Sequence, residues 1–595
     1  MPESGTVWRV GGEMFSWSDW DPAQGPQVRG NALFYLLSEL ASAGRSVLVA
    51  GPHHDDVFTV LGGTGAAVSC VVRSLEDAER IARDYPDVTV YCGTIGKVDA
   101  PDGFDLIVAA DGMDRLTSVE GDHRNADDLI EAMASLLSTH GVLALMHQNI
   151  FGLQHLVELE PGRHYRSDGA WYPVSEHDEV RPASLAELQE RFQAHGLAAA
   201  SAYAVFPAPR LASVFISQHV AGAVVSPLRG PLRSVLFSEL TDAYWDTPVV
   251  QDPRPIVERA VRAGTESALA PAWLTLAHRA EATDVSIPRH DLVVGGADSF
   301  VYEFSADGRQ LQRSVLAPST RQEQRSGLRS VTDPGSARLD AGRLFEDHLL
   351  QLCAHHDLVG LRTALGDFAA WVESRSTDGA VTGPVALTST YELVRTEGDF
   401  WPIPARWEPT SAVPTPVVLA RALWGFAVRL ITLNRPHPWH LAANAAELTF
   451  QLATTAGGTL TSDDLDAAIA LEAACQTAER NLSPEHEPEL RASLAAVGTG
   501  AAGIGIQGYR EMADALWRQD YHLQQMEELV RWTERIIRSR DRALSFMDQE
   551  LKLYQGTATQ KVMLILRRVY RTLRRDARQI MNKVRRNRQK PIEMQ

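Results

Sequence analysis

Strand-length apolar runs alternate with amphipathic helical patterns through the first third of the chain. The runs lie at residues 47–51, 68–72, 88–93, 104–112 and 141–149. One helical face between the last two is marked by Leu129, Met133, Leu136 and Leu137. Because strands that alternate with helices of this length form parallel sheets with helices on both faces, the pattern predicts an α/β domain.

The end of this domain has a different pattern. Ser184 and Glu187 form a capping box at the start of an amphipathic helix. Two apolar runs follow at residues 198–207 and 211–218, and the link between them contains proline. We therefore expect five parallel strands closed by a late hairpin, which gives a seven-strand domain over residues 1–220.

The order of these elements over residues 30–218 resembles that of the class I S-adenosylmethionine-dependent methyltransferases. The resemblance implies a Rossmann-like fold that binds S-adenosylmethionine where its parallel strands end. The corresponding cofactor-binding positions are Gly51, Pro52, His53, His54, Arg73, Ser74, Gly93, Thr94, Asp111, Gly112 and Met113. The candidate catalytic residues are His53, Asp111 and His147. An imidazole with a pKa near neutrality can act as general base on a hydroxyl or amine acceptor.

Two features depart from the methyltransferase pattern. Gly51 is the only glycine in a loop where two or three would let the backbone approach a ligand, and His53 and His54 add bulk there. Arg73 stands where a carboxylate would accept hydrogen bonds from ribose hydroxyls, and a guanidinium only donates. The same arginine can pair with the 2′-phosphate of NADP in an oxidoreductase, but that fold needs a G-x-G-x-x-G loop, which "GPHHDD" does not supply.

Purely structural roles are the alternative for every candidate. His53 and His54 can cap the following helix or face solvent. Asp111 and Asp114 can cap helices, and His147 can be a packed polar group.

The middle of the chain combines helical patterns with one hairpin pattern. Residues 219–290, punctuated by prolines, are predicted to be loosely helical. Alternating apolar positions on both sides of Ala306-Asp307-Gly308 indicate a hairpin. Helical patterns then cover residues 339–372 and 417–433. This combination favours an α+β middle domain.

This succession of parts is faintly similar to bacterial chain-terminating enzymes of O-antigen polysaccharides, which join a methyltransferase to a kinase-like lobe and end in a coiled coil. In such a lobe, aspartates and an asparagine surround the phosphates of the nucleotide. Here Thr388, Glu392 and Pro404 lie near those positions. Since none can replace the metal chemistry of the missing aspartates, we predict that such a lobe is inactive. An unrelated helical spacer domain is the alternative.

Apolar residues recur every seven positions near the C-terminus. They are Leu516, Leu523, Val530, Ile537, Leu544 and Leu551. This spacing predicts a coiled coil that makes the protein a homo-oligomer through residues 516–554, although a helix packed on its own protein is the alternative. Gly556 is expected to interrupt the helix.

The last 35 residues are strongly basic. Residues 561–595 carry a net charge of +10, whereas the whole chain carries −18. An apolar stripe from Val562 to Val584 makes this tail a basic amphipathic helix, which is typical of anionic membrane surfaces. Nucleic acid is the rival partner, but Tyr570 is the only aromatic residue that can stack on bases.

The bulk composition fits a multidomain cytoplasmic protein. The 595 residues are too many for one core, and the four cysteines form no C-x-x-C pair. No signal peptide or membrane span is expected, and no metal site is predicted, because neighbouring His355 and His356 diverge on a helix. The expected domains are 1–220, 221–450, 451–510, 511–556 and 557–595.

These observations predict a self-associating methyltransferase-like protein, peripheral at the inner membrane face. Its acceptor would be a glycan, a lipid-linked saccharide, a natural-product intermediate or another small molecule. A catalytically degenerate scaffold that uses the coil and the basic tail is the first alternative. An NADP-dependent oxidoreductase is the second.

Overall fold

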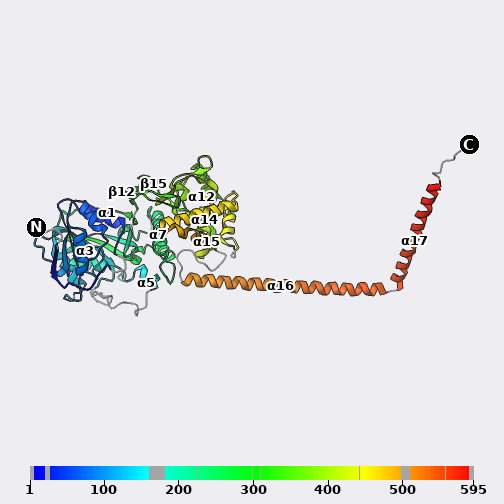
Figure 1. The fold of residues 1–595 in the computed structure, drawn as a ribbon, viewed down its shortest axis with the longest axis horizontal. Coiled ribbons are helices and arrows are strands. Elements are labelled where there is room, and N and C mark those ends of the chain that lie inside the picture. Colours follow the sequence, from blue (N-terminus) through cyan, green and yellow to red (C-terminus); the bar gives the residue numbers. More distant parts are fainter. Residues whose placement is uncertain are drawn as a thin grey trace. The chain divides into compact units, whose positions relative to one another are not determined.

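The computed structural model describes the chain in ten stretches (Figure 1). They are residues 6–20, 27–122, 124–159, 181–223, 226–297, 299–308, 310–440, 443–497, 509–556 and 558–587. The chain has two compact units, Met1–Asp514 and Ala515–Gln595. The boundaries expected at residues 220 and 450 therefore fall inside the first unit.

Five parallel strands form the centre of the first unit. In sheet order they are β4 (Thr89–Gly93), β3 (Ala67–Val72), β2 (Ser46–Ala50), β5 (Phe104–Ala109) and β6 (Leu137–Gln148). Strand β1 (Val7–Gly11) pairs in parallel with β4. The predicted α/β class and the five predicted strands are confirmed.

The side chains of these strands alternate between two helical layers. Val47 and Val49 of β2 pack against one layer, while Leu48 and Ala50 pack against the other. The first layer contains α1 (Asn31–Leu40), α2 (Asp56–Gly63) and α3 (Leu75–Asp84), and the second contains α4 (Ala126–Leu136) and α6 (Leu185–Ala194). A strand buried on both faces needs a continuous apolar run, which is why these five were recognisable from sequence.

The strand beside β6 comes from beyond residue 220. Strand β9 (Ala272–Arg279) lies between β6 and β7 (Leu197–Ala208) and is antiparallel to both. The prediction of a helical region over residues 219–290 is wrong for β9. Its short apolar run is helical or extended according to its neighbours, and here long-range pairing with β6 and β7 decides. Helices α7 (Arg229–Ala243), α8 (Pro253–Ala263) and α9 (Glu266–Leu269) precede it.

Further antiparallel strands continue the sheet past β7. They are β8 (Leu211–Ser217), β10 (Leu292–Val294), β11 (Val301–Asp307), β12 (Gln310–Ala317) and β15 (Ala337–Asp340), which bring this sheet to thirteen strands among the described residues. The predicted hairpins β7–β8 and β11–β12 are confirmed. The sheet thus extends well beyond the seven strands expected for residues 1–220.

A buried histidine ties this extension to the N-terminal layer. His290 lies 2.7 Å from a carboxylate oxygen of Glu39 on α1 and 3.1 Å from one of Glu303 on β11. Burial lowers the pKa of His290, but the two carboxylates outweigh it and raise the pKa to about 9. The charged imidazolium therefore bridges the two segments at neutral pH.

Helices dominate the rest of the first unit. They are α10 (Phe345–Ala354), α11 (Leu358–Ser374), α12 (Thr415–Thr432), α13 (Ala445–Thr455), α14 (Ser462–Glu479) and α15 (Glu487–Ala495). One apolar core joins Leu448 and Ala468 across the boundary expected at residue 450. Within the described residues, α12 alone is long and apolar enough to cross a membrane, but 61% of that window is buried inside the protein. It is a core helix of this unit.

The described residues of the second unit are helical. Helix α16 (Tyr509–Gly556) begins just before this unit, and α17 (Ala558–Asn587) follows it in the chain. Gly556 is the last residue of α16, and residue 557, where the expected interruption would fall, lies outside the described residues.

Candidate functional site

The predicted cofactor-binding residues lie where the parallel strands of the first unit end. Gly51 to His54 follow β2, and Arg73 and Ser74 follow β3. Gly93 is the last residue of β4 and Thr94 comes next, while Asp111 to Met113 follow β5. Carboxyl ends of neighbouring parallel strands meet at one edge, which is where open α/β sheets bind ligands. We call this place the carboxyl edge.

The N-terminal segment of the chain crosses this edge. Met14 N donates to Arg73 O at 2.8 Å, and Leu75 N donates to Met14 O at 3.1 Å, so the segment pairs with the end of β3 like a short strand. The Ser118 hydroxyl donates to Gly12 O at 2.5 Å on the other side. Residues 12–20, here called the crossing segment, are thereby fixed by backbone as well as side-chain contacts.

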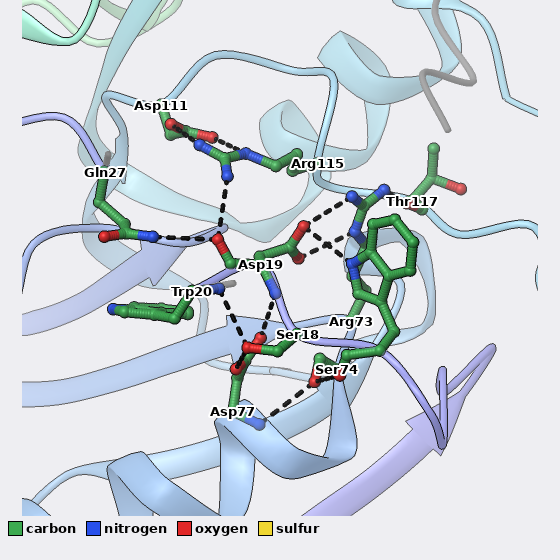
Figure 2. A network of polar contacts seen from close by, with 11 residues as sticks. Ser18, Asp19, Trp20, Gln27, Arg73, Ser74, Asp77, Asp111, Arg115 and Thr117 are labelled. Atoms are coloured by element: carbon green, nitrogen blue, oxygen red, sulfur yellow. Dashed lines mark hydrogen bonds and ion pairs between the residues drawn. The ribbon is translucent and has the colours of Figure 1, made fainter. Parts of the chain in front are cut away.

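The centre of the crossing segment holds a buried ion pair (Figure 2). Arg73 donates from Nε and Nη2 to the two carboxylate oxygens of Asp19, at 2.9 and 2.7 Å. Its Nη1 donates to Thr117 O at 3.2 Å, and the guanidinium lies 5.6 Å from the ring centre of Trp17. The Arg73 side chain is 2% exposed and that of Asp19 is 0% exposed. Every nitrogen of this arginine is therefore already engaged inside the protein.

A second layer of contacts surrounds this pair. Asp77, in the first turn of α3, accepts from the Ser18 hydroxyl at 2.6 Å and from Asp19 N at 2.8 Å. Asp111 accepts from Nε and Nη2 of Arg115, and Nη1 of the same guanidinium donates to Asp19 O at 3.4 Å (Figure 2). Asp111, a predicted catalytic and cofactor-binding residue, thus lies beside Arg115.

His53 occupies the space between the ends of β2 and β5. Its Nδ1 lies 3.0 Å from Gly51 O, and Ala110 N donates to its Nε2 at 3.0 Å. These two bonds require a neutral ring that donates from Nδ1. Burial lowers the pKa of His53 below its ordinary value, which agrees with that state.

Other predicted residues are used by the fold in similar ways. A Cβ atom on Gly93 would collide with Gly11 O of β1, and Thr94 N donates to Gly11 O at 3.1 Å. The Ser74 hydroxyl caps α3 and contacts Trp17 O. Glycine at position 93 is thus required by the approach of β1.

The remaining predicted residues differ in their exposure. Met113 is 2% exposed, and Gly51 has a positive φ of 86°. His54 is partly exposed and lies 3.2 Å from a carboxylate oxygen of Asp56. Pro52 is buried, and Gly112 likewise has a positive φ, of 90°.

His147 lies in a different environment. Its Nε2 is 2.8 Å from Pro182 O, and its ring stacks on Trp273 with centroids 6.5 Å apart. Burial lowers the pKa of His147 to about 4. Within the described residues, no hydrogen bond joins His147 to His53 or Asp111.

Sequence analysis did not identify Trp17, Asp19 or Arg115. The available signal was Arg73, because a guanidinium at the end of a buried strand requires a carboxylate. The stretch "SWSDW" at residues 16–20 supplies that acid between two tryptophans.

The residues at the carboxyl edge do not fit an adenosyl group in this arrangement. Ribose hydroxyls need an acceptor after β3, but Arg73 only donates and is saturated by Asp19 and Thr117. The imidazole of His53 and the crossing segment occupy the edge at which the methyltransferase resemblance places the cofactor. A 2′-phosphate of NADP would likewise have to displace Asp19 from Arg73.

No family model matches the chain, and no curated protein matches it. Solved structures to which it is similar include the CcbJ methyltransferase of Streptomyces caelestis, at 15% identity over 47% of this chain and 100% of that one, with a TM-score of 0.26. Another is the 1,6-didemethyltoxoflavin-N1-methyltransferase of Burkholderia thailandensis with bound S-adenosylhomocysteine, at 14% identity over 42% and 77%, with a TM-score of 0.22. A third is a phosphoethanolamine N-methyltransferase of Haemonchus contortus, at 13% identity over 42% and 52%, with a TM-score of 0.23.

Proposed function

We propose that this chain is a methyltransferase-like protein whose carboxyl edge has become structural, and that it acts as a self-associating scaffold at an anionic membrane surface. The observation that carries this proposal is the buried ion pair of Arg73 and Asp19. It stands where the methyltransferase resemblance places the ribose of the cofactor. Methyl transfer from S-adenosylmethionine to a saccharide or small-molecule acceptor is the alternative, and it requires the crossing segment to leave.

The free-energy cost of moving the crossing segment away from the edge decides between a scaffold and an active methyltransferase. Separating a buried ion pair leaves an uncompensated charge and costs about 3–5 kcal/mol. A cofactor would have to supply this free energy before gaining any contact of its own. Since about 1.4 kcal/mol corresponds to a tenfold change in affinity, the penalty weakens cofactor binding roughly a thousandfold.

Helix α16 supports the assembly part of the proposal. The side chains of its heptad stripe, Leu516 to Leu551, are 51% to 61% exposed in the single chain. Six repeats of this kind are typical of coiled coils, and a second copy of the chain presents the same stripe. We expect the full chain to be a homo-oligomer by light scattering, and Ile537→Lys with Leu544→Lys to yield the monomer mass. An unchanged mass would contradict self-association through α16.

Helix α17 supports the membrane part. Its apolar residues, from Val562 to Val584, are exposed, and arginines occupy its other faces. Each basic residue near anionic lipid contributes about 1 kcal/mol. Flotation of the full chain with phosphatidylserine vesicles is expected to succeed, and to fail for Arg567→Glu, Arg568→Glu and Arg571→Glu combined.

A matched control tests whether membrane binding depends on the arginines of α17 or only on the net charge of the chain. Arg531→Glu, Arg535→Glu and Arg542→Glu change the charge equally on α16, and we expect this variant to float. Equal loss in both variants would contradict membrane binding through α17. A nucleic-acid-binding tail predicts retention on RNA in place of flotation.

Calorimetric titration with S-adenosylhomocysteine tests the scaffold proposal against catalysis. A scaffold gives no saturable heat at cofactor concentrations up to the millimolar range. Saturable heat with a micromolar Kd would favour the methyltransferase alternative. Saturation by NADPH instead would favour the oxidoreductase.

A further inference from the structure

The first unit also contains a pocket whose lining residues lie between 234 and 479, beyond those of the carboxyl edge in the sequence. It is lined by α7, the Gly295-Gly296 loop after β10, residues 403–407, α12 and α14, and its cavity volume is about 50 Å³. Glu392 and Pro404, noted from sequence near the positions of kinase-like residues, both line it. A cavity of this size holds a few water-sized groups, so it admits the charged end of a ligand while the rest of the ligand stays outside.

Negative charge is in excess in this pocket. Its lining contains the carboxylates of Glu239, Asp242, Glu392 and Glu479 and the guanidinium groups of Arg406 and Arg421. Arg406 is shared by Glu239 and Asp242, the latter at 3.2 Å. Arg421 pairs at 2.8 Å with Glu472, which lies outside the lining. Within the described residues, neither Glu392 nor Glu479 has an ion-pair partner.

The pKa values of these carboxyl groups reflect the excess of carboxylates over guanidinium groups. Glu479 is an exposed residue, but the protein that surrounds its carboxyl group, and then the carboxylates of Asp242, Glu472 and Glu392, raise the pKa of Glu479 to about 8. Burial and Glu239 raise the pKa of Asp242 to about 6 against the pull of Arg406. At neutral pH Glu479 therefore keeps its proton, and a cation that binds beside it would release that proton.

Unsatisfied polar atoms point to a ligand independently of the acids. Ser234 is 1% exposed, lines the pocket, and its hydroxyl has no hydrogen-bond partner. The Nε of Arg421, on a side chain 8% exposed, is likewise unpaired. A buried polar atom without a partner costs about 1–3 kcal/mol, which a bound hydroxyl or carbonyl group would recover. Tyr302 and Trp407 also line the pocket, and aromatic rings attract cations.

We propose that this pocket binds a small organic cation, an amine or guanidine that also carries a hydroxyl or carbonyl group. The charged nitrogen pairs with Glu479 and Glu392, and the polar group bonds to the Ser234 hydroxyl. A phosphate-bearing nucleotide would meet four carboxylates and an Arg406 that is already shared. No group of three or more His, Cys, Asp or Glu in the described part of the chain is placed to hold a metal ion. The proposal goes beyond the scaffold function and is independent of it.

Calorimetric titration of the full chain at low salt tests this proposal, with spermidine and D-glucosamine as separate probes and ATP and Mg²⁺ as counter-probes. We expect saturable binding of one amine, which identifies a polyamine or an amino sugar as the class. At pH 7 binding should release a proton, so the heat should vary with the ionisation enthalpy of the buffer. Saturable heat with ATP and none with either amine overturns the proposal, as does the absence of heat for both amines.

Two isosteric variants test whether the amine binds in the pocket or to the overall negative charge of the chain. Glu479→Gln is expected to weaken amine binding at least tenfold and to abolish proton release. Glu485→Gln removes the same charge from an exposed turn before α15 and should leave both unchanged. Equal weakening by both variants overturns the proposal, since it would mean that the amine binds the net charge of −18 and not the pocket.

Discussion

The carboxyl edge and the acidic pocket are both rich in charged groups, but their charges are balanced differently. At the edge each arginine has its own acid, Arg73 with Asp19 and Arg115 with Asp111. In the pocket two arginines face four acids. Buried hydroxyls without a partner occur at both sites, on Thr94 and Thr117 at the edge and on Ser234 in the pocket, so the difference between the sites is one of charge. A site whose charges are paired gains little when a charged ligand enters, whereas a site with uncompensated charge gains free energy from a counter-charge.

The largest expected effect comes from breaking the edge. Asp19→Ala leaves the Arg73 guanidinium buried without a partner, so we expect a loss of about 3–5 kcal/mol in the free energy of unfolding by urea. Asp84→Ala is the control, because Asp84 is 43% exposed and pairs with Arg83 at the surface. The control should cost less than about 1 kcal/mol. Similar small losses in both variants would mean that the Arg73–Asp19 pair does not hold the edge.

Acid should destabilise the fold through the buried ring of His147. The pKa of His147 is about 4 in the folded protein and 6.5 in the unfolded chain. A lowered pKa stabilises the fold above pH 6.5, and this stabilisation is lost as the pH falls toward 4. The loss amounts to about 3 kcal/mol. His147→Gln keeps a donor for Pro182 O and removes the titration, so its stability should fall by that much less between pH 6.5 and 4. Parallel curves for the two proteins would contradict a buried neutral ring.

Base should destabilise the acidic pocket. The pKa of Glu479 is about 8 in the folded protein, above the 4.5 of the unfolded chain. Its contribution is therefore complete below pH 4.5 and is lost as the pH rises through 8. Because Glu479 is an exposed residue and solvent screens its charge, we expect this contribution to the free energy of unfolding to be only about 1 kcal/mol, or roughly 2 °C in Tm. Glu479→Gln should melt higher than the native chain at pH 9 and equally at pH 5, whereas Glu485→Gln should match the native chain at both. No difference at pH 9 would contradict excess charge in the pocket.

The sequence was informative wherever short-range patterns decide structure. The five parallel strands were predicted because their apolar runs are buried on both faces, and Ser184 was recognised as a helix cap from its spacing to Glu187. Strand β9 was missed because its place depends on pairing with β6 and β7, more than 60 residues away. Local patterns carry no information on such pairing.

The position of the candidate site could be predicted from the sequence, but the pairing of its buried charges could not. The predicted residues do gather at one edge, because parallel strands bring their carboxyl ends together. Asp19 lies 54 positions before Arg73 in the chain, and no spacing rule connects them. The uneven charge of the acidic pocket likewise depends on five segments that meet only in the folded unit.

Hydrogen exchange of the crossing segment, with and without saturating S-adenosylhomocysteine, tests the closed edge most directly. The amides of Met14 and Asp19 donate to Arg73 O and to the Asp77 carboxylate, so they report whether residues 12–20 stay in place. We predict slow exchange at both amides that the nucleoside leaves unchanged. Faster exchange there on addition of the nucleoside, together with new protection at residues 51–54, would contradict the account.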